Sequence, residues 1–103
     1  MEQKLTITNR SERAVVLMLE PWGEDYWMRA GETFELIPDK PDETFYFAVE
    51  YRANEIDVFA EGGCRCVKVE REGELLECGH QRPKERKHDV DQSYPPGPDT
   101  CGH

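Results

Sequence analysis

The chain has 103 residues, of which 37% are hydrophobic and 34% are charged, with two Trp, four Tyr and four Phe. These apolar side chains suffice for one modest core, so we expect one domain and a tail. The formal net charge is −9, and the excess lies in residues 1–80, because residues 81–103 hold four basic and four acidic side chains. An acidic body repels phosphate groups, which excludes nucleic-acid binding by this part of the chain from the expected functions.

The sequence carries no signal for a membrane or for export. No apolar run approaches the roughly 20 residues that a membrane-spanning helix needs. The first residues, MEQKL, lack the apolar segment of a signal peptide. We therefore expect a cytoplasmic protein with no membrane partner, in which the four cysteines are thiols or metal ligands rather than disulfides.

The first half of the chain is organised around the apolar run 14–19, which predicts a central strand because both of its faces need cover. Pro21 and Gly23 mark a turn directly after it. The short segments 25–29 and 33–37 follow, separated by a second turn. Three strands joined by two tight turns predict a meander.

The second half continues with short strands. Two prolines and three acids predict a loop over residues 38–43. Segment 44–51 alternates, and Phe59 in the next strand points away from the inward side chains of its neighbours. Gly62-Gly63 predicts a flexible joint. The side chains of 44–51 that we expect to point inward are Phe45, Phe47, Val49 and Tyr51.

The overall pattern is that of an all-β fold, because turn residues separate the strands and no helical periodicity occurs. We expect a small antiparallel β-sandwich or barrel of about eight short strands, spanning residues 1–80. Residues 81–103, rich in Pro, Gly and charge, are expected to form an extended C-terminal tail without a core. The expected strands are 3–9, 14–19, 25–29, 33–37, 44–51, 55–60, 64–70 and 75–78.

The turn Leu19-Glu20-Pro21-Trp22-Gly23-Glu24 lies between Thr8-Asn9-Arg10-Ser11 and Ala30-Gly31-Glu32. In this respect the chain resembles small uncharacterised bacterial proteins that share an N-terminal β region with an EPWG turn. Those proteins usually have Pro-Gly where this chain has Ala30-Gly31. The resemblance covers about the first sixty residues, implies an all-β fold and carries no activity with it.

Cys64, Cys66, Cys78 and His80 form the strongest local motif. Three thiols and an imidazole are a complete tetrahedral ligand set for zinc, and one hairpin could deliver both pairs to one point. A Cys-x-Cys pair on a strand, however, spaces its sulfur atoms roughly 6 to 7 Å apart. One ion can bridge that distance only where the strand bends.

The register of the last hairpin decides between a metal site and idle thiols. A two-residue loop, Glu72-Gly73, sets Val69 opposite Leu76 and puts the two cysteine-containing pairs on opposite faces. A three-residue loop, residues 72–74, puts all four candidate ligands on one face. The hydrophobic pattern favours the first register, in which Cys78 is a small buried side chain.

Trp22, Tyr26 and Trp27 cluster around the first turn. As an exposed patch they would form a binding surface, since tryptophan and tyrosine are enriched in interaction hot spots. Alternatively, Trp27 closes one end of the core and Trp22 covers it. The sequence leaves both interpretations open.

A catalytic constellation is hard to build, so we expect no enzymatic activity. The three histidines lie at or beyond the end of the predicted domain, and no nucleophile elbow or phosphate loop occurs. Paired carboxylates such as Glu24-Asp25 are predicted to be solvated surface. The expected function is a non-enzymatic acidic interaction module with an unknown protein partner and no cofactor. The alternatives are a structural zinc-binding protein and an acidic inhibitor or immunity-type protein.

Overall fold

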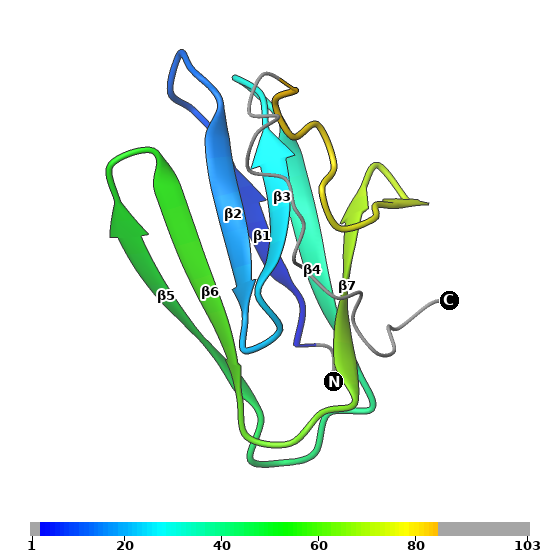
Figure 1. Cartoon of the computed structure of the whole chain (residues 1–103). Helices are drawn as coiled ribbons and strands as arrows, with labels where there is room; N and C mark the ends of the chain where they lie inside the picture. Colours follow the sequence, from blue (N-terminus) through cyan, green and yellow to red (C-terminus); the bar gives the residue numbers. More distant parts are fainter. Residues whose placement is uncertain (1–2, 85–103) are drawn as a thin grey trace.

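The computed structural model describes residues 3–84, which form two four-stranded β-sheets packed face to face (Figure 1). The all-β sandwich of eight strands is therefore confirmed. In this part of the chain no helix is long and apolar enough to cross a membrane. Most of the predicted tail, residues 85–103, lies outside the described residues. The strands are β1 (Leu5–Thr8), β2 (Val15–Glu20), β3 (Glu24–Met28), β4 (Thr33–Asp39), β5 (Tyr46–Arg52), β6 (Glu55–Glu61), β7 (Cys66–Arg71) and β8 (Glu74–Leu75).

The first sheet has the strand order β1-β4-β7-β8, and the second has the order β3-β2-β6-β5. The run 14–19 is central as expected, since β2 lies between β3 and β6. All pairs are antiparallel except β2 with β6, which run parallel from Val16 opposite Glu55 to Glu20 opposite Phe59. The purely antiparallel arrangement expected from the short turns is therefore wrong at this one pair.

The predicted meander is also wrong, because β4 does not pair with β3. The chain crosses after β3 to the first sheet, where β4 pairs with β1 and β7. The buried side chain of Asn9 holds this crossing: its amide donates to the carbonyl oxygens of Arg13 (2.9 Å) and Met28 (3.1 Å). The Asn9 backbone also bonds the second turn, donating to Glu32 and accepting from Gly31. Both sheet-crossing turns are thereby tied together at one end of the sandwich.

At the other end, two connections pass between the sheets side by side, β4 to β5 and β6 to β7 (Figure 1). They are bonded to each other: Asp42 donates its amide to the carbonyl of Gly63 (2.9 Å), and Gly63 donates to the hydroxyl of Thr44 (3.1 Å). Gly62 has φ +80°, and a Cβ there would lie 2.2 Å from the carbonyl oxygen of Thr44. The predicted flexible joint is thus a close-packed crossing that requires glycine.

The predicted loop 38–43 begins two residues too early, because β4 continues through Pro38 and Asp39. Pro38 is buried and lies opposite Val67 of β7. Pairing with β1 has already ended at Leu36, so the proline lies where the strand has a neighbour on one side only. Proline is tolerated at such an edge.

The core lies between the two sheets and takes its side chains from both. Alternate residues of β2 are buried, as are those of β4. Because cross-strand partners share a face, this alternation fixes which face of each sheet is the inner one. The fully buried side chains are Leu17, Leu19, Met28, Phe34, Leu36, Val58 and Val69.

Candidate functional site

The structure does not bring Trp22, Tyr26 and Trp27 into one patch. Trp22 is 40% exposed in the turn between β2 and β3, but Tyr26 is buried in the core and donates its hydroxyl to Glu24 (2.8 Å). Trp27 is half-buried on the opposite face of β3, because successive strand residues point to opposite faces. Tyr26 is therefore not accessible to a partner in this structure.

The four candidate metal ligands are likewise divided between two places. Cys64 is half-buried against the core, beside Asp39 and Asp42. Cys78 instead donates a hydrogen bond to Asp25 on β3 of the second sheet (3.5 Å). Within residues 3–84, no group of three or more His, Cys, Asp or Glu side chains is placed to hold a metal ion.

The last hairpin explains this separation. Its loop is Glu72-Gly73, with both residues at positive φ and Glu70 opposite Leu75, which confirms the two-residue register. The predicted return strand 75–78 does not form, since β8 ends at Leu75 and the chain then leaves towards β3.

One cysteine differs from the expected thiol or metal ligand. Cys64 and Cys78 are free cysteines, whereas Cys66 is disulfide-bonded. The expectation of a buried Cys78 is wrong, because its side chain is exposed where the chain leaves the hairpin towards β3. Partial desolvation against β3, together with the negative charge of Asp25, raises the pKa of the Cys78 thiol. This thiol is consequently protonated at neutral pH and a poor nucleophile.

The segment Cys78–Arg82 lies along β3 and covers the edge of the second sheet. Gly79 donates its amide to the carbonyl of Asp25 (2.6 Å), and Trp27 donates to the carbonyl of His80 (2.9 Å). The carbonyl of Asp25 and the amide of Trp27, which face away from β2, are thereby paired. Docking continues past residue 80, where we expected the tail to begin.

Asp25 is the main anchor of this segment. Its carboxylate accepts two hydrogen bonds from the Arg82 guanidinium (2.6 and 2.8 Å) and one from the Trp27 indole (2.9 Å). Burial alone would raise the pKa of Asp25, but the hydrogen bonds from Arg82 and Trp27 and the charge of Arg82 outweigh it and lower the pKa. The carboxylate predicted to be solvated surface is thus a structural contact.

Glu32 provides a second anchor at the turn before β4. It accepts hydrogen bonds from Arg71 (2.8 Å), from the side-chain amide of Gln81 (2.9 Å) and from the backbone of Arg29 (2.7 Å). Gln81 also donates to the carbonyl of Trp27 (2.7 Å). These bonds outweigh burial and lower the pKa of Glu32.

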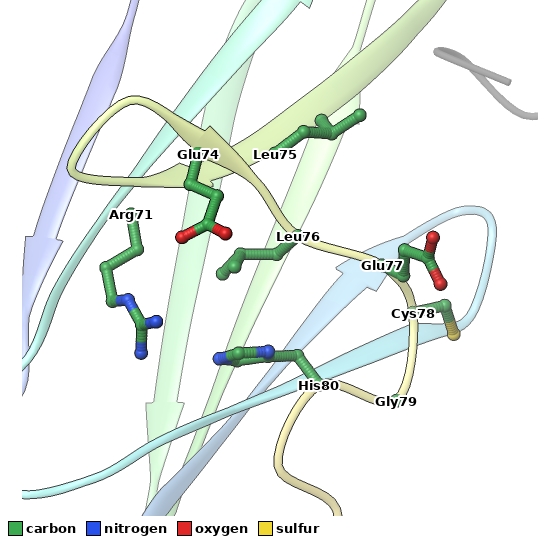
Figure 2. Close-up of a pocket in the computed structure, with 8 residues that line it drawn as sticks. All are labelled: Arg71, Glu74, Leu75, Leu76, Glu77, Cys78, Gly79 and His80. Atoms are coloured by element: carbon green, nitrogen blue, oxygen red, sulfur yellow. The ribbon is translucent and has the colours of Figure 1, made fainter.

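A shallow cavity of about 390 Å³ marks the place where the hairpin end meets the docked segment (Figure 2). In this view the side chains of His80 and Leu76 both extend towards Arg71. The His80 ring packs edge-on against Phe34, with centroids 5.8 Å apart. Burial and the nearby charge of Arg71 lower the pKa of His80, so the imidazole is neutral at pH 7. Arg71 is paired with Glu32, which also accepts a hydrogen bond from Gln81. These polar groups therefore help to hold the segment Cys78–Arg82 against β3. The lining residues are Arg71, Glu74, Leu75, Leu76, Glu77, Cys78, Gly79 and His80.

The opposite edge of the second sheet is open. Beyond β5 no strand of the described chain follows (Figure 1). Val49 is 49% exposed and Tyr51 72% exposed, although both lie on the inner face of the sheet, as predicted. Val58, the cross-strand partner of Val49, is completely buried. The apolar inner face thus extends beyond the cover that the first sheet provides.

The free backbone groups of β5 follow from its register with β6. A two-residue loop closes the hairpin, so Arg52 and Glu55 form a hydrogen-bonded pair. Bonded pairs alternate with non-bonded ones along the ladder. The N–H and C=O groups of Phe47, Val49 and Tyr51 therefore point to the open edge.

Charge on this hairpin is confined to its outer face. The acids of β5 and β6 all occupy the positions that alternate with Val49 and Val58. Arg52 is held by Asp57, with its guanidinium 2.7 Å from the carboxylate. A hydrogen bond with Asp57, burial and the charge of Asp57 raise the pKa of Glu55. The acids are Glu50, Glu55, Asp57 and Glu61.

Comparisons with models of protein families, with curated proteins and with solved structures found no match to this chain. The description of the fold and of the two edges of the second sheet therefore rests on the structure alone.

Proposed function

We propose that the protein is a non-enzymatic interaction module that binds a protein partner through the free edge of β5. The carrying observation is the exposure of Val49 and Tyr51 on the face of the sheet that forms the core elsewhere. Large apolar side chains left uncovered beside an unpaired strand mark a binding surface.

The length and regularity of β5 support this assignment. Seven consecutive residues pair with β6 without interruption, from Tyr46 opposite Glu61 to Arg52 opposite Glu55. Natural proteins protect such edges with bulges, prolines, lysines or covering segments. β5 has no bulge in its pairing with β6 and contains neither Pro nor Lys. Within residues 3–84 the other strand edges are shorter: four residues at β1, two at β8, and the part of β7 before Glu70, which β8 does not pair.

A photo-crosslinking amino acid placed at single positions of the full chain tests this proposal in the source organism. We expect a discrete covalent adduct from positions 46 and 51, where Tyr46 is 58% and Tyr51 72% exposed. Thr6, exposed on the outer face of the first sheet, is the matched control and should give none.

Position 22 tests the alternative surface, since Trp22 is 40% exposed at the first turn. An adduct from position 22 without one from 46 or 51 would move the binding surface away from β5. Absence of a discrete adduct from all these positions would contradict the interaction module itself.

A further inference from the structure

We propose that the partner of β5 is an extended basic segment that adds to the second sheet as a fifth strand and alternates apolar with cationic side chains. This inference rests on the proposed function, whose partner it assigns to a chemical class. Three features of the hairpin carry it: the free backbone groups, the apolar inner face and the acidic outer face.

The backbone of β5 offers a complete docking edge. Phe47, Val49 and Tyr51 each present one N–H and one C=O to the open side, as the register requires. A peptide of about seven residues matches the length of β5 and would satisfy all of these groups. Such pairing supplies affinity without regard to side chains.

The inner face selects apolar side chains. On this face β5 carries Phe47, Val49 and Tyr51, and β6 carries Ile56 beside Tyr51. Every second residue of an added strand would lie next to this apolar row and cover the exposed parts of Val49 and Tyr51. Valine, isoleucine or aromatic residues fit this row.

The outer face selects cations. Every acid of the hairpin lies on this side. The buried Asp57 already holds Arg52, the only basic residue of the hairpin, so the acids left on this face are Glu50, Glu55 and Glu61. Glu50 lies at the centre of β5, next to the position that an outer side chain of the added strand would occupy. The net charge of −9 adds a long-range attraction for a basic segment.

Charge also argues against two other occupants. A second copy of the chain would bring two bodies of charge −9 together. The chain's own residues 85–103 contain no run that alternates basic with apolar residues. A basic segment of another protein satisfies both faces of the hairpin.

Titration of the isotope-labelled full-length protein tests this assignment with a capped seven-residue peptide that alternates arginine with valine. We expect saturable binding with the largest amide shifts at Phe47, Val49 and Tyr51. Two peptides serve as controls: one with the arginines and valines in separate blocks, and one N-methylated at alternate residues along one edge. Each control should bind at least about tenfold more weakly, because the first loses the two-faced pattern and the second loses the backbone bonds.

A variant gives an independent check. Val49→Pro removes one edge N–H without removing a bond to β6, so it should weaken the alternating peptide about tenfold. Should this variant fail to fold, the N-methylated peptide on the wild-type protein remains decisive.

Three results would overturn the assignment: no binding of the alternating peptide at millimolar concentration, equal binding of the blocked or N-methylated peptide, or a dimer in light scattering whose β5 amides are protected without peptide. If the alternating peptide does not bind but crosslinking at position 51 still succeeds, the proposed interaction module stands and only the basic class of its partner is refuted.

Discussion

The two edges of the second sheet are treated in opposite ways. At β3 the segment Cys78–Arg82 pairs with the edge backbone, and two carboxylates, Asp25 and Glu32, hold it there. At β5 no segment among residues 3–84 covers the backbone, and apolar side chains lie beside it. Of the two edges of this sheet, the described part of the chain closes the one at β3 and leaves the one at β5 uncovered. This contrast adds a second reason, besides the exposure of Val49 and Tyr51, for treating the β5 edge as functional.

The largest expected effect concerns the crossing that positions β5. In Gly62→Ala the new Cβ would meet the carbonyl oxygen of Thr44 at 2.2 Å, and φ is +80°. We expect a loss of about 3 kcal/mol in the free energy of unfolding, measured with urea. Gly73→Ala is the matched control: φ is +83° but no atom lies within 4 Å, so only the conformational cost of about 1 kcal/mol applies. Equal losses would show that the crossing is not close-packed.

The next effect tests the closed edge. Asp25→Ala removes the bonds to Arg82 and Trp27, and we expect a loss of about 2 kcal/mol together with faster hydrogen exchange of the Trp27 amide. Glu35→Ala is the control, since its contact with Lys4 is long (3.6 Å) and exposed and should contribute under about 0.5 kcal/mol. Unchanged exchange at Trp27 would mean that the segment is held without Asp25.

A smaller effect should appear with pH at the same edge. The pKa of Asp25 is lower in the folded protein than in the unfolded chain, so its ionised form stabilises the fold above the unfolded pKa of about 4. This stabilisation is lost as the pH falls through the folded pKa. The difference in unfolding free energy between the wild type and Asp25→Asn should therefore shrink below about pH 4. A difference independent of pH would contradict the lowered pKa.

The smallest effect belongs to the open edge. Val49 and Val58 are cross-strand partners of the same residue type, one 49% exposed and the other fully buried. Val49→Thr should change the unfolding free energy by less than about 0.5 kcal/mol, because its hydroxyl remains in water. Val58→Thr should cost about 2 kcal/mol, because its hydroxyl is buried. Equal costs would show that β5 is covered in solution.

Local chemistry in the sequence predicts much of this fold. Alternation predicts the strands, and Glu72-Gly73 predicts the register of the last hairpin, because a two-residue loop keeps Val69 and Leu76 on one face. The destination of β4 is not predicted, since a short turn can lead either to a neighbouring strand or across to the other sheet. Asn9 holds that crossing through a bond to the nearby Arg13 and a second bond to Met28, 19 residues along the chain, which local sequence does not reveal.

The site was harder to predict than the strands. Alternation assigns Val49 and Tyr51 to the inner face, but only tertiary packing shows that the first sheet does not cover them. Asp25 looked like a solvated carboxylate because its partner, Arg82, lies far along the chain. One signal was available: tyrosine stands at positions 46 and 51, where a strand that is buried throughout would favour phenylalanine.

The parallel pairing of β2 with β6 has a consequence for the order of folding. Each strand belongs to a local hairpin, β2 with β3 and β5 with β6, and all of β3, β4 and β5 lies between the two partners. Local hairpins form within microseconds, whereas pairing across a long loop is slow. We therefore expect two preformed hairpins to dock late. The β5 edge would then be available to a partner during folding, before β6 has found β2.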